Sequence, residues 1–167
     1  PLEPNGPFNV LVFGGSQGAR ALNEAVAAWC RAGIPAGVSM IWATGRGQYD
    51  AYASLASAQV RVLPYLSPIT EAYAAADVAI TRAGAMSIAE LCAWGVPSVL
   101  VPLPTAAQNH QMHNATAVAA SGAALHLPQT QLSAEQLDTL VRGWMADPSP
   151  LLGMRGAARA RAKPTAA

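Results

Sequence analysis

Short apolar runs alternate with longer amphipathic stretches along the whole chain. The runs are apolar at successive positions, as strands are when helices cover both faces of a parallel sheet. The stretches between them have the length and spacing of helices. Strands are therefore expected at Phe8–Phe13, Val38–Ala43, Val60–Leu63, Asp77–Thr81, Ser98–Val101 and Ala123–Leu127, and helices at 18–32, 47–58, 68–76, 86–94, 108–121, 134–146 and 151–162.

Capping residues support these boundaries. Gly33, Gly95 and Gly122 follow three of the predicted helices, where glycine commonly ends a helix. Ser67-Pro68 is expected to supply an N-cap and a first helical residue, and Ser133-x-x-Gln136 has the pattern of a capping box. Repeated strand–helix units predict the α/β class, with a Rossmann-like, doubly wound parallel sheet of about six strands.

Composition limits what such a domain does. The 167 residues are 52% apolar and 11% charged, with a net charge of +1, so the chain lacks the basic surface of a general nucleic-acid binder. No apolar stretch reaches the ~18 residues of a membrane-spanning helix, and no signal peptide opens the sequence. A cytoplasmic protein is expected. Residues 1–7 are proline-rich and are expected to be a linker that precedes a domain at 8–167 within a longer protein.

Cysteines and late basic residues add little to this picture. Cys30 and Cys92 lie in apolar helical patterns without metal-ligand spacing, so they are expected to be small buried side chains in a reducing compartment. The basic cluster near the end of the chain fits the solvated face of a last helix or a contact with anionic lipid. Its members are Arg155, Arg159, Arg161 and Lys163.

The most informative segment is Gly84–Glu90, which follows a predicted buried strand and opens a helix. A small-residue turn before a helix N-terminus leaves backbone N–H groups facing a ligand, which favours a phosphate. Glu90 would then suit hydroxyls such as those of a ribose. A second interpretation is structural, because Ser87-x-x-Glu90 also has the pattern of a capping box.

Other predicted loops at the same edge carry polar or glycine-rich sequences. Gly14–Arg20 lacks the spacing of both the dinucleotide fingerprint and the P-loop, so it is either a tight turn with Ser16 as a helix cap or a seat for a diphosphate. Tyr65 fits equally a contact with a base and a half-buried position at a strand end. Gln111 follows a long loop, and its amide suits sugar hydroxyls.

Catalytic patterns are missing from the sequence. His110 and His113 are three residues apart, but no third ligand lies in the surrounding loop, so no metal site is predicted. His126 falls in a predicted strand and is interpreted as structural. Neither a nucleophile elbow nor paired carboxylates occur. The chain has groups to hold a nucleotide sugar and no evident general base, so no catalytic residue is assigned.

Several motifs occur in the order seen in the MurG-type glycosyltransferases, which the chain resembles from about Phe8 to its end. They are Gly14–Arg20 followed by Leu22-Asn23, Ala76–Val78, Arg82–Glu90, Gly95–Pro102, and His110-Gln111 with Asn114-Ala115. The resemblance covers the family's C-terminal, donor-binding half. It implies one half of a two-domain glycosyltransferase that moves N-acetylglucosamine from UDP-N-acetylglucosamine to a lipid-linked muramyl-pentapeptide in peptidoglycan synthesis.

The resemblance also implies roles for single residues. Ser16 would contact the diphosphate, the backbone of Leu66 the uracil edge, Glu90 the ribose hydroxyls, and Gln111 the sugar hydroxyls. The chain has about one extra residue between Pro102 and Gln111 compared with some members. The turn that would wrap the nucleotide comprises Ala85, Met86, Ser87, Ile88 and Ala89.

The partners implied are UDP-N-acetylglucosamine, a lipid-linked acceptor and the family's N-terminal domain, with neither a cofactor nor a nucleic acid. That N-terminal domain would carry the acceptor site, the general base and the membrane-facing patch. The whole protein would therefore lie peripherally on the inner face of the plasma membrane. Alternatives are another UDP-sugar enzyme of this architecture, such as an epimerase or a glycolipid glycosyltransferase, or a bare nucleotide-binding module.

Overall fold

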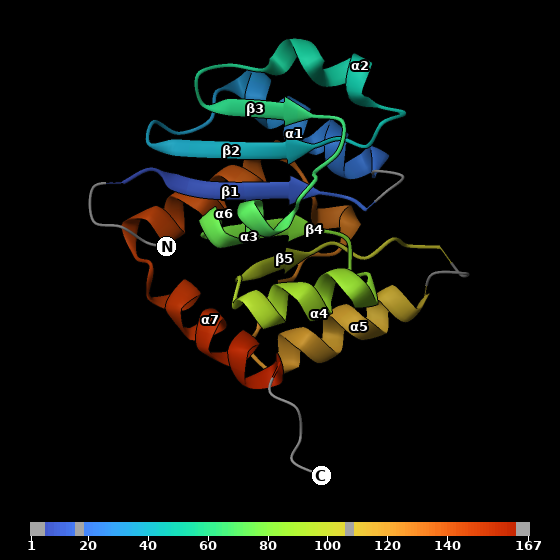
Figure 1. Ribbon diagram of the computed structural model, residues 1–167, viewed down its shortest axis with the longest axis vertical. Helices are drawn as coiled ribbons and strands as arrows, with labels where there is room; N and C mark the ends of the chain where they lie inside the picture. Colours follow the sequence, from blue (N-terminus) through green and yellow to red (C-terminus); the bar gives the residue numbers. More distant parts are fainter. Residues whose placement is uncertain (1–5, 16–18, 106–108, 163–167) are drawn as a thin grey trace.

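Six parallel strands form one sheet through the centre of the molecule (Figure 1). The computed structural model describes residues 6–15, 19–105 and 109–162. The strand order is β3-β2-β1-β4-β5-β6, which is a doubly wound sheet whose switch point lies between β1 and β4. The strands are β1 (Phe8–Phe13), β2 (Val38–Ala43), β3 (Val60–Leu63), β4 (Val78–Thr81), β5 (Ser98–Leu100) and β6 (Ala124–His126).

Helices cover both faces of this sheet. Helices α1 and α6 pack together on one face, whereas α3 and α4 lie on the other, with α5 and α7 beside α4. The helices are α1 (Arg20–Ala32), α2 (Tyr49–Tyr52), α3 (Thr70–Ala75), α4 (Ala85–Trp94), α5 (Asn109–Ala120), α6 (Ala134–Ala146) and α7 (Ser149–Ala162), with 3-10 turns η1 (Ala53–Leu55) and η3 (Gln129–Gln131).

The central strand β1 explains why both faces must be covered. Val10 and Val12 belong to the core cluster under α1 and α6, while Leu11 and Phe13 belong to the cluster under α3 and α4. Successive strand residues point to opposite faces, so a strand with apolar side chains on both faces needs a helical layer on each side. The predicted α/β class and doubly wound sheet are confirmed.

Most predicted boundaries agree with the structure. Gly33 and Gly95 directly follow α1 and α4, and Gly122 follows α5 two residues later. The Ser133 side chain accepts a hydrogen bond from the Gln136 N–H at the start of α6, as its capping motif predicted. Two strands start one residue later than expected, β4 at Val78 and β6 at Ala124. Asp77 still bonds to β1, because its N–H donates to the Asn9 carbonyl and its carboxylate accepts the Asn9 N–H.

Two helix predictions need correction. Ser67-Pro68 does not open α3, which begins at Thr70 with Ile69 in the N-cap position. Leu66 and Ile69 both pack against the core, so the chain turns between them before the helix starts. The helix expected at 47–58 is only α2 followed by η1, and neither element has a fully buried residue to support a longer helix.

The two cysteines are free thiols, Cys92 buried and Cys30 partly buried, and burial raises the pKa of each. Within the described ranges, none of the helices combines the length and the apolar character needed to cross a bilayer.

Gly95 ends α4 in the left-handed conformation, with φ of 64°. A Cβ placed there would lie 2.5 Å from Nε of Arg159, which crosses over this glycine from α7. We expect Gly95→Ala to lower the free energy of unfolding by about 1–2 kcal/mol, the cost of a left-handed alanine. Urea denaturation measures the loss. In an Arg159→Ala background the clash with Arg159 is removed, but the cost of the left-handed backbone remains. If Gly95→Ala caused no loss of stability in that background, this explanation would be contradicted.

Candidate functional site

A cavity of about 360 Å³ opens at the carboxyl edge of the sheet, beside the switch point. Its walls come from the ends of β1, β2 and β3, from α3 and from one side of α4. This is where doubly wound folds bind ligands, and the volume is within the range of small-molecule pockets. The lining residues are Phe13, Gly15, Ala43, Gly45, Pro64, Tyr65, Leu66, Ile69, Tyr73, Met86, Ser87 and Glu90.

The N-terminus of α4 begins directly after the β4 turn, with Gly84 in the N-cap position and no side-chain cap. The first helical hydrogen bond in this turn runs from the Ile88 N–H to the Gly84 carbonyl at 3.0 Å. The three N–H groups before it have no acceptor within the helix, and together with the helix dipole they favour an anion. A phosphate group is the anion expected at this helix N-terminus.

The capping-box interpretation of Ser87-x-x-Glu90 is wrong. Ser87 is the third residue of α4 and Glu90 the sixth, because Gly84 is the N-cap and the helix begins at Ala85. Glu90 therefore lies too far along the helix to satisfy an N-terminal N–H group. Its carboxylate instead lines the cavity.

Glu90 is exposed to solvent, and it is the one carboxylate among the lining residues described above. Its Oε2 accepts a hydrogen bond of 2.8 Å from the hydroxyl of Tyr73, which comes from α3. Burial and this hydrogen bond both raise the pKa of Tyr73, so the phenol keeps its proton and acts as the donor. A carboxylate held at a cavity wall suits a ligand that offers hydroxyl groups.

The structure brings only some of the predicted residues together at this cavity. Glu90 lies there with three more of them: Leu66, Met86 and Ser87. The Met86 side chain is 79% exposed at the rim. Ile88 is buried in the core between α4 and α5.

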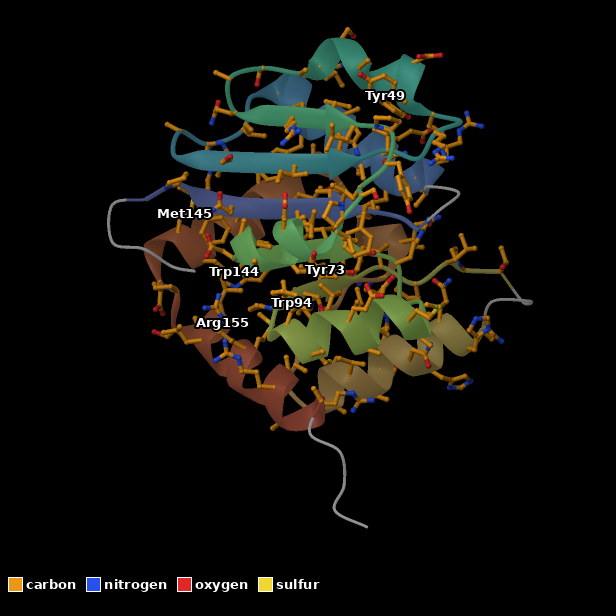
Figure 2. The ribbon with its side chains drawn as sticks, viewed as in Figure 1. Tyr49, Tyr73, Trp94, Trp144, Met145 and Arg155 are labelled. Carbon is orange, nitrogen blue, oxygen red and sulfur yellow. The ribbon has the colours of Figure 1, made fainter. Side chains whose placement is uncertain are left out.

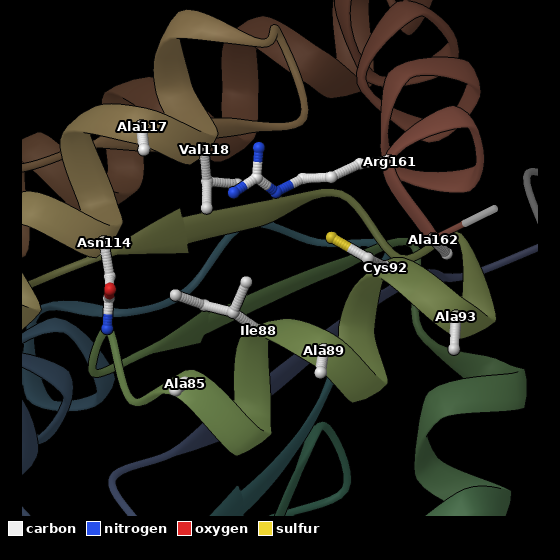
Figure 3. Close-up of a pocket in the computed structure, with 10 residues that line it drawn as sticks. All are labelled: Ala85, Ile88, Ala89, Cys92, Ala93, Asn114, Ala117, Val118, Arg161 and Ala162. Atoms are coloured by element: carbon white, nitrogen blue, oxygen red, sulfur yellow. The ribbon is translucent and has the colours of Figure 1, made fainter. Parts of the chain in front are cut away.

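Ala85 and Ala89 lie on the other side of α4, where they line a second cavity of about 430 Å³ (Figure 3). This cavity lies between α4, α5 and the end of α7, and small apolar side chains make up most of its wall. Cys92 and Arg161 reach into it. It is the larger of the two, but it does not meet the ends of β1 and β2, so the switch-point cavity is the better candidate for a nucleotide.

Gln111 belongs to the first turn of α5 and lines neither of the two cavities. Its Oε1 accepts a hydrogen bond of 3.1 Å from the Leu103 N–H, so part of this amide supports its own loop. Its NH₂ group has no hydrogen bond among residues 6–15, 19–105 and 109–162. Ser16 lies outside the described residues. Helix α1 begins at Arg20 after Ala19, and Gly15 borders the switch-point cavity.

Tyr65 is 50% exposed and lines the switch-point cavity. The guanidinium of Arg46, from the loop after β2, lies 4.7 Å from the centroid of its ring. This cation–π contact holds an aromatic surface at the mouth of the cavity. The ring therefore lies after the end of β3 and also borders the cavity, which is compatible with both interpretations of Tyr65.

Sequence reasoning assigned no role to three residues that shape this edge. The first is Tyr73, the partner of Glu90. The second is Arg82, which is 8% exposed and donates from Nη1 to the carbonyls of Val101 and Pro102 at 3.1 and 3.4 Å. The third is Asn114, which donates to the Ala83 carbonyl at 3.1 Å. Arg82 and Asn114 belong to the motifs that the chain shares with the MurG-type enzymes, so the sequence could have indicated them. Tyr73 belongs to no such motif, and only its position in a predicted helix could have pointed to it.

His110 and His113 are exposed on α5, and His126 lies in β6. In the described part of the chain, no three His, Cys, Asp or Glu side chains are grouped closely enough to hold a metal ion.

Comparison with known proteins identifies relatives over almost the whole chain. The model of the glycosyltransferase family 28 C-terminal domain matches residues 9–167. A UDP-N-acetylglucosamine–N-acetylmuramyl-(pentapeptide) pyrophosphoryl-undecaprenol N-acetylglucosamine transferase of Nitratidesulfovibrio vulgaris is 40% identical over 99% of this chain and 46% of its own length. The enzyme of the same name from Xanthomonas campestris pv. campestris is 43% identical over 97% of this chain and 39% of its own length.

Comparison with solved structures identifies the same kind of protein as the sequence comparison. The crystal structure of MurG from Acinetobacter baumannii superposes with a TM-score of 0.83 and 35% identity, over 97% of this chain and 48% of that one. The chain thus spans less than half the length of each relative. Because the family model matches nearly every residue, the chain belongs to glycosyltransferase family 28, and the part it contains is the family's C-terminal domain.

Proposed function

We propose that this domain binds UDP-N-acetylglucosamine and is the donor-binding half of an inverting glycosyltransferase. The whole enzyme would transfer N-acetylglucosamine to undecaprenyl-pyrophosphoryl-muramyl-pentapeptide in peptidoglycan synthesis. The observation that carries this proposal is the meeting of the α4 N-terminus and the Glu90 carboxylate at one switch-point cavity. The names of the relatives that match nearly the whole chain support this choice of donor and acceptor.

Each part of the donor has a proposed partner. The diphosphate lies at the free N–H groups of α4, in the turn Ala85–Ala89, with Ser16 as a further contact. The ribose hydroxyls donate to Glu90, and the uracil edge contacts the backbone of Leu66, which lines the cavity. Gln111 uses the amide NH₂ group, which Leu103 leaves available, for the hydroxyls of the sugar.

The chemistry assigned to this half is stabilisation of the leaving group. Negative charge develops on the UDP diphosphate as its bond to the sugar breaks. Preorganised N–H groups and the positive end of the α4 dipole stabilise that charge without reorganising during the reaction. The acceptor site and the general base are assigned to the family's N-terminal domain, through which the whole enzyme would lie peripherally on the inner face of the plasma membrane.

UDP is expected to stabilise the chain in the absence of divalent metal, since the α4 N-terminus supplies the positive potential. Ligand at ten times its Kd contributes about 1.4 kcal/mol to the free energy of unfolding by mass action. For a domain of this size that raises Tm by about 3–6 °C. A thermal melt with millimolar UDP and EDTA measures this shift. A shift with NAD and none with UDP would favour a dehydrogenase-type domain instead.

Activity is tested on a protein that contains this domain together with an N-terminal domain of the family. Incubation with UDP-N-acetylglucosamine and the lipid-linked acceptor is expected to give the glycosylated lipid. Epimerised free sugar would identify an epimerase of the same architecture. Binding without either product would leave a nucleotide-binding module and contradict the proposed transfer.

A further inference from the structure

Tyr73 is almost completely buried, at 3% exposed, yet its hydroxyl reaches the exposed Glu90 at the wall of the switch-point cavity. The donor–acceptor distance is 2.8 Å, which is typical of a well-formed hydrogen bond. Within the described part of the chain, this is the one hydrogen bond that the Glu90 carboxylate makes. It joins α3 to α4 across 17 residues of sequence.

Aromatic neighbours fix the ring that carries this hydroxyl. The Tyr73 ring makes an edge contact with Phe13 at 6.1 Å between centroids and a tilted contact with Trp94 at 6.4 Å. Phe13 ends β1, so the ring is anchored beside the switch point. Trp94 lies four residues after Glu90, on the same side of α4. Tyr73 and Trp94 lie next to each other in Figure 2.

This arrangement removes rotational freedom from Glu90. An exposed glutamate normally samples several rotamers, and ordering it on ligand binding carries an entropic cost. The buried phenol binds Oε2 and leaves Oε1 without a hydrogen-bond partner among the described residues. A carboxylate has about four lone-pair positions, so one bond from Tyr73 leaves room for two hydroxyl donors.

We propose that Tyr73 is a positioning residue, whose hydroxyl holds the Glu90 carboxylate ready to accept both ribose hydroxyls of the nucleotide. This inference rests on the proposed function, because it assumes that Glu90 binds the ribose. Tyr73 itself lines the cavity, and the role proposed here is the one that its hydroxyl exerts through Glu90. Specificity for a ribonucleotide follows, since a carboxylate fixed in this way favours two adjacent hydroxyl donors over one.

A purely structural role is the competing explanation, because the same hydrogen bond also clamps α3 to α4. The two explanations differ in how the effect depends on the ligand. If Tyr73 positions Glu90, its loss lowers the affinity only for ligands that have ribose hydroxyls. A structural role changes the shape of the whole cavity and affects every uridine nucleotide alike.

The test is isothermal titration of this chain with UDP and with 2′,3′-dideoxyuridine 5′-diphosphate. The variants are Tyr73→Phe, Glu90→Ala and the double variant. Phenylalanine keeps the ring and its contacts with Phe13 and Trp94, so folding is expected to persist. Tyr49→Phe is the matched control, because Tyr49 lies in α2 and does not line the cavity (Figure 2).

Tyr73→Phe is expected to raise the Kd for UDP about three- to tenfold, the worth of one net hydrogen bond. It should leave the Kd for the dideoxy nucleotide unchanged and add nothing in the Glu90→Ala background. Equal losses for both nucleotides would establish the structural role and overturn the inference. A further loss in the Glu90→Ala background would mean direct contact with the ligand and would also overturn it.

The Glu90 variant distinguishes failure of the ribose assignment, on which this inference rests, from failure of the role of Tyr73 alone. If Glu90→Ala binds UDP as tightly as the unmodified chain, the ribose assignment is wrong and the positioning role is lost with it. If Glu90→Ala weakens UDP binding while Tyr73→Phe binds normally, the ribose assignment stands and only the role of Tyr73 is overturned.

Discussion

Replacing Glu90 with glutamine is expected to weaken UDP binding by about 1.5–3 kcal/mol, the scale of a hydrogen bond to a charged group. That corresponds to roughly a ten- to hundredfold rise in Kd. Glutamine retains the shape of the side chain and one acceptor oxygen. It loses the charge and the second oxygen that two ribose hydroxyls require. Titration calorimetry measures the change.

The stability of this variant should change little, because Glu90 is exposed and does not cap α4. Glu135→Gln is the matched control, since Glu135 is also exposed and belongs to α6, away from the switch-point cavity. The control should bind UDP normally. Ser87→Ala is unsuitable as a control for helix damage, because Ser87 does not cap α4 and lines the cavity. Unchanged UDP affinity in Glu90→Gln would contradict the ribose assignment.

Much of the fold was predictable because the strands are apolar on both faces. In β4 all four residues are buried, and such a run is stable only beneath helices on both sides. The errors fall where tertiary contacts override local signals. Ser67-Pro68 has the composition of a helix start, but packing of Leu66 and Ile69 into the core delays α3 until Thr70. Asp77 directly precedes β4, where the Asn9 N–H bonds to the Asp77 carboxylate while the Asp77 N–H donates to the Asn9 carbonyl.

The candidate site was predictable in its location and less so in its members. Parallel strands bring their loops to one edge, so Leu66 and Glu90 could be placed together from sequence order alone. The partner of Glu90 could not, since the contact between Tyr73 and Glu90 depends on how α3 packs against α4. The predicted turn Ala85–Ala89 is helical, so its side chains point in different directions. Ser87 lies on one side of α4 and Ala89 on the other.

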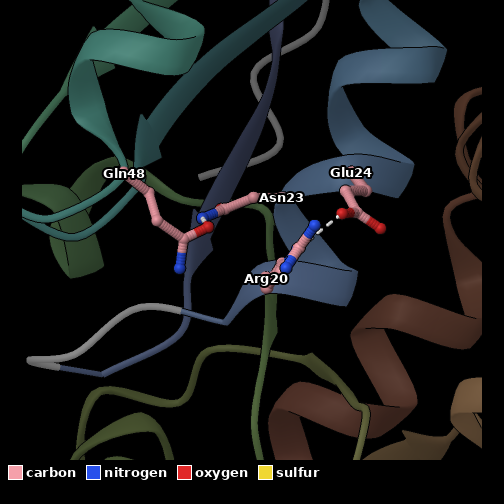
Figure 4. Close-up of polar contacts among 4 residues, drawn as sticks. All are labelled: Arg20, Asn23, Glu24 and Gln48. Carbon is pink, nitrogen blue, oxygen red and sulfur yellow. Dashed lines mark hydrogen bonds and ion pairs between the residues drawn. The ribbon is translucent and has the colours of Figure 1, made fainter.

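The largest loss of stability is expected from Asn23→Ala, which breaks a buried polar network beside the same cavity. Asn23 is 1% exposed, and its hydrogen bond to Thr44 joins α1 to the end of β2. Figure 4 shows the Asn23 side chain next to Gln48. The Nδ2 of Asn23 donates to the Thr44 carbonyl at 2.8 Å and to Oε1 of Gln48 at 3.0 Å. Its Oδ1 accepts a hydrogen bond of 2.9 Å from the indole N–H of Trp42, a fully buried side chain.

Alanine at position 23 leaves the Trp42 indole N–H without its acceptor and the Thr44 carbonyl without its donor. Each buried polar group that loses its partner costs about 1–3 kcal/mol, so the free energy of unfolding should fall by about 3 kcal/mol or more. That is a large share of the 5–15 kcal/mol typical of a folded domain. Urea denaturation followed by tryptophan fluorescence measures the loss.

Arg20→Ala is the control on the same helix, three residues before Asn23. Its ion pair with Glu24, the dashed line in Figure 4, has an N–O distance of 2.9 Å, but both side chains are largely exposed. Water and salt screen such a pair, so its removal should not measurably change the unfolding midpoint. Equal midpoints for Asn23→Ala and Arg20→Ala would contradict the view that the buried network secures the end of β2. Because Thr44 directly precedes the cavity residue Gly45, the stability lost in Asn23→Ala should be accompanied by weaker UDP binding.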